Sequence, residues 1–257
     1  MKNNPRYFTY LIQNLLFIVI ILSLPSCALK PASELDSPEY HHKAGMRHVE
    51  IGKYSEALTS FERAIGLDKK FAPAYAGMGI AYANLGERKK AKKYAGEAED
   101  RGGKDPDVLT LCARVWIDLR HQEKKWYKPA EKLLKKALKR NKNHEGATYY
   151  TGELFLYQYE FSQAEDQFRQ VVDMKGEYSG KANKMWQMSQ KIVRAMPGTS
   201  VGKKVALHEK ITRADLAVLL AEELKISTLM ERQTTPASGF QTPEEIRAAN
   251  APKGGPS

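Results

Sequence analysis

Few residues of this sequence have the types and spacing that catalysis or metal binding requires. His41 and His42 are adjacent, but neighbouring residues of a helix point about 100° apart, which is a poor geometry for a metal pair. Cys112 occupies a position that is expected to pack in a core, which favours an inert thiol over a nucleophile. The sequence has no Gly-x-Ser-x-Gly turn, phosphate loop, dinucleotide-binding glycine pattern or His-Glu-x-x-His motif. We therefore predict no catalytic residue, no metal site and no cofactor, and we expect binding rather than catalysis.

Composition narrows the class of protein. The 257 residues include 41 Lys and Arg against 30 Asp and Glu, a formal charge of +11, and 42% of them are hydrophobic. This length and apolar content suffice for a real core, which excludes collagen-like and wholly disordered chains. Two cysteines are too few for a disulfide framework or a four-cysteine zinc site. The basic excess leaves three explanations open: nucleic acid, an anionic envelope surface, or a solvated helix face.

The middle of the chain repeats with a period of 34 residues. A shift by that number places Gly45 on Gly79 and Ala57 on Ala91. Such a period is typical of a solenoid built from helix pairs. Small residues at the eighth and twentieth positions let the two helices of a pair approach closely, and bulky residues at the eleventh and twenty-fourth fill the seam. The pattern predicts an all-α fold.

These positions resemble the tetratricopeptide repeat (TPR). The resemblance implies a helix-turn-helix solenoid of four units within residues 38–178. The third unit stays in register only with five residues inserted around 121–128. An apolar stripe over 179–196 predicts a further helix that caps the open end of the stack.

The first residues have the pattern of an export signal. A basic start precedes an apolar stretch, 11–24, that is shorter than the about 20 residues needed to span a bilayer. The stretch ends in Leu24-Pro25-Ser26-Cys27, which resembles a bacterial lipobox. The resemblance implies a signal peptide over 1–26, diacylation of Cys27 and a tether over 27–37. Ala28, where an inner-membrane retention aspartate would stand, implies a lipid-anchored protein of the outer membrane that faces the periplasm. An ordinary signal peptide with an incidental cysteine is the alternative.

In TPR solenoids the first helix of each unit lines a concave groove, which binds an extended peptide or a helix of a partner protein. The resemblance therefore assigns a partner-binding groove to His42, Glu50, Asn84, Arg114, Asp118, Tyr149, Glu153 and Tyr157. The same positions of the four units also include Met46, Ala76, Ile80, Thr110, Ile117 and Leu156. Tyr149 and Tyr157 are the expected anchors, because aromatic side chains bury a large area at low entropy cost. The alternative is that some of these residues only pack against the neighbouring unit.

Positive charge is concentrated in one predicted helix. Residues 124–142 contain nine basic residues and one acidic residue. The outer face of this helix is predicted to carry Lys132, Lys135, Lys136, Lys139 and Arg140. A solvated convex face is the simplest interpretation, and contact with phosphate-rich lipid heads or an acidic wall polymer is the sharper one. Nucleic acid ranks lower as a partner, because the export signal removes the chain from the cytoplasm.

A smaller signal follows a predicted linker over 197–204. Thr212 is a natural helix N-cap, and the helix after it should turn Leu216 and Leu220 toward a core, together with Leu219 and Leu224. The run resembles the Thr-Arg-Ala-Glu helix of S-layer homology (SLH) domains, and the resemblance assigns polymer binding to Arg213. The aromatic-rich half of that module is absent, so a short capped helix is an equal alternative. The SLH-like segment covers 205–232, and 233–257 is predicted to be a disordered tail.

These features predict a lipid-anchored TPR scaffold of the bacterial cell envelope that binds a partner protein in its groove. The alternative is a structural tether that links the outer membrane to a cell-wall polymer through the SLH-like helix and the basic face.

Overall fold

The computed structural model describes residues 36–195, 197–208, 210–223 and 244. The predicted signal peptide, Cys27 and nearly all of the tether lie outside the described residues. So do residues 224–232 of the SLH-like segment and the predicted tail, residue 244 excepted. Within the described ranges, none of the helices combines the length and apolar character needed to cross a bilayer.

Each predicted repeat contains a pair of helices. The pairs are α2 (Pro38–Glu50) with α3 (Tyr54–Leu67), α4 (Ala72–Asn84) with α5 (Arg88–Gly102), α6 (Pro106–Asp118) with α7 (Tyr127–Arg140), and α8 (Glu145–Tyr157) with α9 (Phe161–Met174). Then follow α10 (Ser179–Ala195), α11 (Ser200–Val205) and α12 (Arg213–Glu222).

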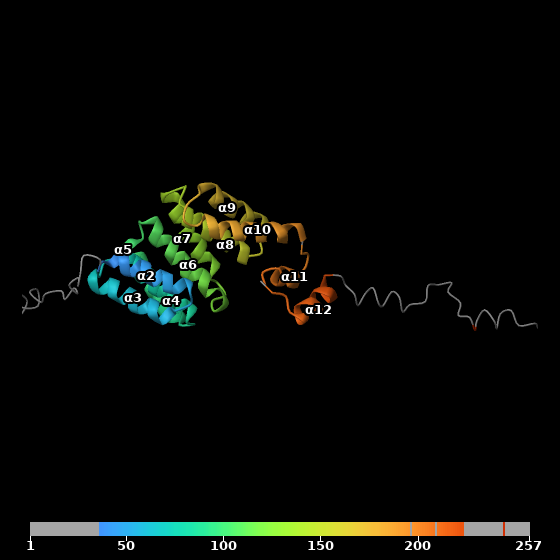
Figure 1. Ribbon diagram of the computed structural model, residues 1–257, viewed down its shortest axis with the longest axis horizontal. Helices are drawn as coiled ribbons and strands as arrows, with labels where there is room; N and C mark the ends of the chain where they lie inside the picture. The colour runs from blue at the N-terminus through green and yellow to red at the C-terminus, as the bar shows by residue number, and fades with distance from the viewer. Residues whose placement is uncertain (1–35, 196, 209, 224–243, 245–257) are drawn as a thin grey trace, which may run out of the picture.

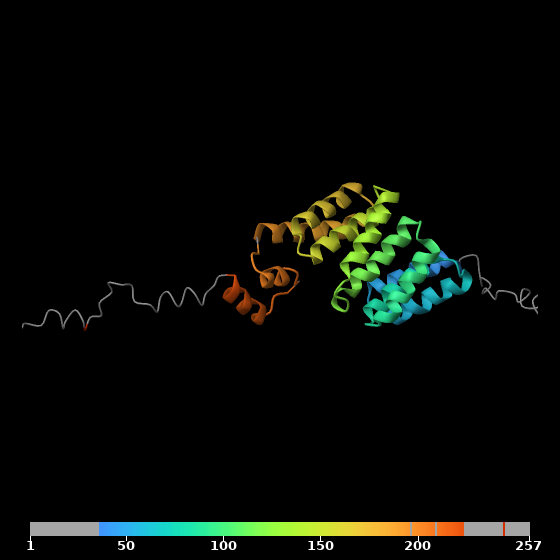
Figure 2. The same cartoon turned by 180° about the vertical axis from the view of Figure 1, so that it is seen from behind.

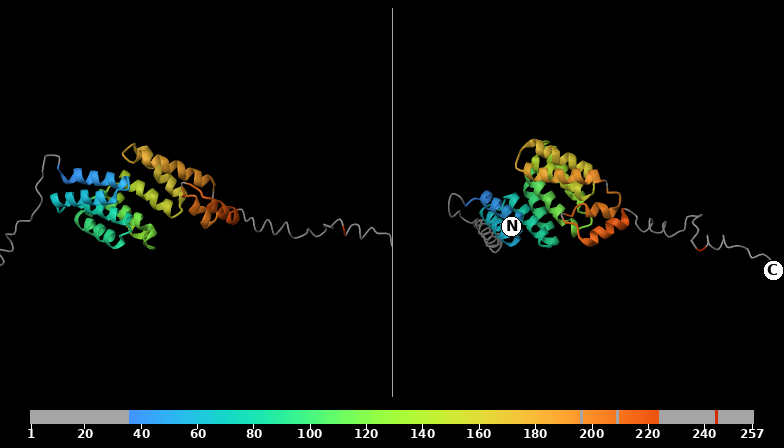
Figure 3. Two further views of the ribbon diagram at one scale, coloured as in Figure 1. Left: turned by 60° about the horizontal axis from the view of Figure 1, so that its bottom comes forward. Right: turned by 45° about the vertical axis from the view of Figure 1, so that its right-hand side comes forward.

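The helix pairs stack into a solenoid (Figures 1 and 2). The first helices of the units, α2, α4, α6 and α8, pack side by side, and each packs against the second helix of its own unit. Helix α10 packs on α9, and the α11–α12 pair lies at the C-terminal end of the stack (Figure 3). The expected all-α solenoid is confirmed.

Local sequence explains where the first helices begin. Ser37 and Asp105 act as N-caps, because their side chains accept hydrogen bonds from the amides of Tyr40 and Asp107. Proline occupies the first turn of α2, α4 and α6, where its missing N–H costs nothing. His144 caps α8 through Nδ1, which accepts from the amide of Ala147 at 3.0 Å.

Small residues bring the helices of a unit together, as their spacing predicts. A Cβ atom added at Gly152 would lie 2.7 Å from the ring of Phe168 on α9, so only glycine fits there. The fully buried ring of Phe61 on α3 lies against Gly45 of α2 and also against Gly77 of α4. The alanines at the twentieth and twenty-seventh positions are fully buried: Ala57, Ala64, Ala91, Ala98, Ala130, Ala137 and Ala164.

The insertion in the third unit forms a connection of its own. A short 3-10 helix, η1 (Leu119–His121), continues α6 before the chain turns into α7. Gln122 donates from Nε2 to the carbonyl of Ala83 at 2.9 Å, and Lys92 pairs with Glu123. The inserted residues therefore lie against the second unit and lengthen the edge of the inner face there.

The C-terminal part differs from expectation in two ways. Residues 197–204 are not only a linker, because α11 begins at Ser200 and Glu223 accepts hydrogen bonds from the amide and hydroxyl of Thr199. Helix α12 starts with Thr212 as its N-cap, as expected, in a capping box with Asp215. The expectation that its leucines face a core is wrong, since Leu216 and Leu220 are 51% and 37% exposed and α12 has no buried residue. Leu224 lies outside the described residues.

Candidate partner-binding groove

Seven of the eight predicted groove residues line one hollow of about 430 Å³: Glu50, Asn84, Arg114, Asp118, Tyr149, Glu153 and Tyr157. They come from the first helices of all four units, so the repeat carries them to one inner surface. The hollow is also lined by Val49, Tyr54, Arg120, Tyr150 and Lys181. Three basic and three acidic side chains thus face the same space, and the hollow has no net charge.

His42 does not belong to this hollow. Its ring lies between the aromatic rings of Phe61 and Phe71, with centroids 5.9 Å from each. Burial lowers its pKa to about 4, so the imidazole is neutral at physiological pH. His42 is therefore a packing residue of the first unit, and its assignment to the groove is corrected.

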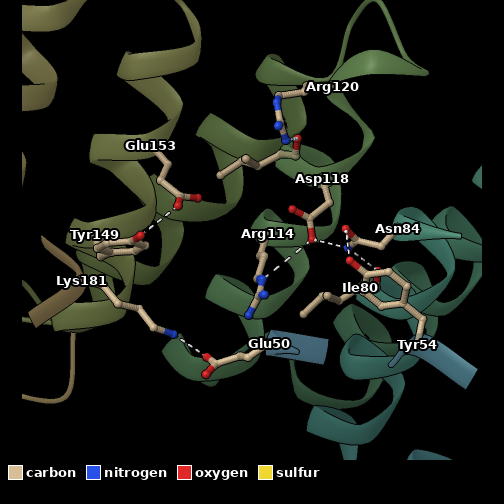
Figure 4. Close-up of polar contacts among 11 residues, drawn as sticks. Glu50, Tyr54, Ile80, Asn84, Arg114, Asp118, Arg120, Tyr149, Glu153 and Lys181 are labelled. Atoms are coloured by element: carbon tan, nitrogen blue, oxygen red, sulfur yellow. Dashed lines mark hydrogen bonds and ion pairs between the residues drawn. The ribbon is translucent and has the colours of Figure 1, made fainter. Parts of the chain in front are cut away.

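A polar chain runs along the floor of the hollow from α3 to α6 (Figure 4). Tyr54 donates from its hydroxyl to Asn84 Oδ1 at 3.3 Å, and Asn84 donates from Nδ2 to Asp118 Oδ2 at 3.0 Å. Asp118 Oδ2 also lies 3.8 Å from Nε of Arg114, one helical turn back on α6. These contacts hold the side chains of three successive units in fixed positions.

The wall of the hollow on α8 is built from Tyr149, Glu153 and Tyr157, which are spaced one helical turn apart. Tyr149 donates from its hydroxyl to Glu153 Oε1 at 2.9 Å (Figure 4). Burial raises the pKa of the Glu153 carboxyl, and the charge of Asp118 raises it further. No cation within the described residues forms an ion pair with Glu153. The wall therefore presents a carboxyl group that forms no ion pair of its own, although the charges of Arg114 and Arg120 partly offset the rise in its pKa.

The two expected aromatic anchors behave differently. The ring of Tyr149 is only 6% exposed and packs on Tyr150, Phe168 and Tyr178, so it supports the wall instead of offering a surface. Tyr157 remains partly exposed at the rim. The guanidinium of Arg120 stacks over its ring, 4.1 Å from the centroid, which extends the contact surface by a cation–π pair.

Sequence reasoning missed Arg120 and Lys181. Arg120 lies in η1, and Lys181 lies in α10, so neither falls in the repeating columns that identified the other residues. Lys181 forms an ion pair with Glu50 at the end of α2 (Figure 4). The short helix after α6 and the cap thus add positive charges to the groove.

The alternative of simple packing holds for the apolar groove positions. Ala76 and Ile80 are fully buried, and Thr110, Ile117 and Leu156 are buried as well. Thr110 donates its hydroxyl to the carbonyl of Pro106 at 2.7 Å within its own helix. Among these positions only Met46 is partly exposed, and it packs against the core of the first two units.

The predicted basic face is on the outside of the solenoid. The five basic side chains on α7 are all exposed: Lys132, Lys135, Lys136, Lys139 and Arg140. Lys135 pairs with Glu131 at 2.7 Å, and Lys136 pairs with Glu99 of α5 at 2.6 Å. Lys136, Lys139 and Arg140 line a second hollow of about 630 Å³ together with Gly103.

Arg213 is exposed in the first turn of α12, away from the residues of the groove.

The remaining residues whose side chains could act as nucleophiles or metal ligands contact neighbouring groups and do not form a site. Cys112 is buried, its Sγ lies 3.5 Å from the carbonyl of Ala95, and burial raises its pKa to about 12. His41 Nε2 lies 2.6 Å from Asp36. The described residues contain no cluster of three or more ligands for a metal ion.

Comparison with known proteins supports this fold. A family model described as a TPR repeat matches residues 45–86, which span parts of the first two helix pairs. A thermophilic TPR protein of Thermus thermophilus superposes with a TM-score of 0.51 and 18% sequence identity, over 76% of this chain and 96% of its own. This solenoid has the TPR fold.

A TPR protein of Parabacteroides merdae also matches, with a TM-score of 0.41 and 17% identity over 85% of this chain and 84% of that one. A comparison with curated proteins found no significant match. TPR domains generally bind protein partners and are generally not enzymes, which suggests a protein-interaction scaffold.

Proposed function

We propose that this chain is a lipid-anchored TPR scaffold of the bacterial cell envelope whose groove holds a segment of a partner protein. One observation carries the groove assignment: seven residues predicted from the repeat positions line a single hollow on the first helices of the four units. An envelope location and the anchor rest on the lipobox-like Leu24-Pro25-Ser26-Cys27.

The charges of the hollow define the partner segment that fits it. Glu50 is neutralised by Lys181, and Asp118 lies beside Arg114. Glu153 and Arg120 form no ion pair within the described residues, although Arg120 acts on Glu153 through its charge and stacks on Tyr157. A partner segment that brings a basic side chain to Glu153 and an acidic one to Arg120 would satisfy both groups, and burying such pairs gives specificity.

The groove is tested by neutralising these two groups. Glu153→Gln with Arg120→Gln changes no net charge and should abolish co-purification of the crosslinked partner from membranes. The matched control is Glu131→Gln with Lys135→Gln, which removes one acid and one base from the outer face of α7 and should leave the same partner bound. Equal recovery of the partner by both double variants, with unchanged circular dichroism, would refute the groove assignment.

The anchor is tested separately. Growth with a radiolabelled fatty acid should label the wild-type chain and not Cys27→Ser. Equal labelling of the two would exclude diacylation of Cys27 and would leave the groove experiment interpretable.

A second candidate function is a tether to a cell-wall polymer. It is favoured by the exposure of Arg213 in the first turn of a helix that has no buried residue, because its guanidinium is open to an acidic sugar. Sedimentation with purified wall polymer tests it. Arg213→Ala should lose binding if the tether exists, and retained binding by that variant removes the role of Arg213.

A further inference from the structure

The point at which residues 27–35 join the solenoid is held in place. Asp36, the first described residue, contacts His41 of α2 and forms an ion pair with Arg63, which lies one turn before the end of α3. Asp36 therefore lies at the edge where α3 ends and the first helices begin.

This edge, which we call the tether edge, consists of the four loops that connect successive helix pairs: 68–71, 103–105, 141–144 and 175–178. Hydrogen bonds join neighbouring parts of it. Arg101 donates from Nε to the carbonyl of Lys69 at 3.3 Å, and His144 Nε2 lies 3.0 Å from Asp107 Oδ1. The amide of Tyr178 donates to Glu145 Oε1 at 2.9 Å. The loops are thus one continuous border of the solenoid.

Unpaired basic side chains gather along the tether edge and the adjoining last turn of α7. Seven of them are exposed and form no ion pair within the described residues: Lys69, Lys70, Lys104, Lys139, Arg140, Lys142 and Lys175. By contrast, Lys135 and Lys136 in the middle of α7 have acidic partners. Exposed lysines without an ion pair among the described residues also lie just before α7, at its start and in its middle, at Lys124, Lys125, Lys128 and Lys132, but the larger group is the one along the tether edge and the last turn of α7.

The second hollow lies at this same end. Its walls are Lys136, Lys139 and Arg140 of α7 and Gly103 of the tether edge, and its volume is about 630 Å³. Lys139 and Arg140 lie in the last turn of α7, where positive side chains interact favourably with the negative end of the helix dipole. A guanidinium with an ammonium beside it suits a phosphate group, which Arg can bind through two hydrogen bonds.

We propose that the tether edge is the face that rests on an anionic lipid bilayer, with lipid phosphate groups received at the end of α7. This inference rests on the proposed anchoring at Cys27 for its choice of partner. Nine residues lie between Cys27 and Ser37, which is at most about 36 Å of extended chain, so an anchored solenoid stays close to the bilayer. Such a tether lets the solenoid reach the bilayer, and within about 10 Å of its surface lysines and arginines gain binding energy from anionic lipids.

Binding to vesicles tests the proposal, with a matched control near the other end of the same helix. The test variant is Lys139→Gln, Arg140→Gln and Lys142→Gln. The control is Lys124→Gln, Lys125→Gln and Lys128→Gln, which removes the same charge from exposed lysines at and just before the start of α7. Both are made in residues 27–257 with Cys27→Ser, so that neither an acyl chain nor the apolar stretch 11–24 contributes.

Sedimentation is measured with phosphatidylcholine vesicles with and without about one-third phosphatidylglycerol, at increasing salt. We expect the test variant to bind the anionic vesicles about a hundredfold more weakly than the parent, and the control to bind nearly as the parent does. Equal weakening of both variants, or binding that does not respond to salt, overturns the proposal. Binding to soluble polyphosphate without binding to vesicles overturns the bilayer as partner.

A second measurement locates the face that touches the vesicle directly, without relying on the difference in affinity between the two variants. A polarity-sensitive fluorophore is attached at Lys142→Cys or at Lys128→Cys, in the Cys27→Ser chain whose other thiol, Cys112, is buried. Anionic vesicles should shift the emission to shorter wavelength at position 142 and not at 128. The opposite result places the other edge on the membrane and overturns the proposal. A failure of Cys27 labelling by fatty acid leaves both measurements valid, because neither uses the acyl chain.

Discussion

Lys181 of α10 forms an ion pair with Glu50 at the end of α2, across a sequence separation of 131 residues. The cap thereby contacts the first repeat, although α10 packs on α9 at the other end of the stack. Because both residues line the hollow, the ion pair forms part of its wall. A partner must enter beside this pair or separate it.

The Glu50–Lys181 pair should contribute little to stability. The two side chains are 46% and 53% exposed, and exposed pairs are worth about 0.2–1 kcal/mol and are screened by salt. A double-mutant cycle with Glu50→Gln and Lys181→Gln, measured by denaturant unfolding, should give a coupling energy in that range that vanishes at high salt. A coupling that is larger, or that persists in high salt, would contradict this view of the pair.

Glu153→Gln should stabilise the fold at neutral pH. The pKa of Glu153 is raised above its usual 4.5 in the folded chain, mainly by burial, so the folded state holds its proton more tightly than the unfolded state does. The stabilisation that the folded state gains by holding this proton is fully present below pH 4.5 and is lost as the pH rises through the pKa of Glu153 in the folded chain. The glutamine keeps an acceptor for the Tyr149 hydroxyl and has no charge to desolvate. Unfolding free energies measured from pH 4 to 8 should fall with pH in the wild type more than in the variant, and parallel curves would argue against the raised pKa.

Two glycine substitutions should have opposite effects. Gly152→Ala forces a methyl group to within 2.7 Å of the Phe168 ring and should destabilise the chain by about 1–3 kcal/mol. Gly96→Ala lies on the exposed side of α5 with no atom within 4 Å of the new Cβ, and should stabilise it by about 0.5–1 kcal/mol. Thermal unfolding of both variants checks the pair of predictions. A Gly152→Ala chain as stable as the wild type would mean that α8 and α9 do not approach as described.

Cys112 should react only when the fold opens. Its thiol is buried and its pKa is raised to about 12, so the thiolate is scarce at pH 8 and out of reach of reagents. In a Cys27→Ser chain, an aromatic disulfide reagent should remain unreacted under native conditions and should release one equivalent of chromophore in denaturant. Rapid reaction of the native protein would show that α6 is accessible from outside.

The sequence could predict most of the solenoid because its packing is periodic. Gly152 opposite Phe168, like Gly45 opposite Phe61, follows from small and bulky residues at fixed places in each unit. The same register identified the residues on the inner helix faces, which is why Arg114, Asp118 and Glu153 could be placed in one groove from the sequence alone.

The residues that were missed or misplaced are those outside this register. Arg120 belongs to the short helix that continues α6 and Lys181 to the cap, and the positions of these segments depend on tertiary contacts and not on a period. His42 shares the face of α2 with Glu50, but the rings of Phe61 and Phe71 enclose it, and helical spacing alone does not show which neighbours cover a residue. The leucines of α12 fit a helix pattern, yet that pattern contains no information on whether anything packs against it.

Phe61 couples the folding of the first repeat to that of the second. Its ring occupies the space left by Gly45 in the first unit and by Gly77 in the second, so one side chain serves as the wedge for both. A protease that removed α2 and α3 would take this wedge away and expose apolar residues of α4 to solvent. In the intact protein the first two repeats should therefore unfold together. In a shortened protein that begins at the second repeat, α4 and α5 should unfold more easily than they do in the intact protein.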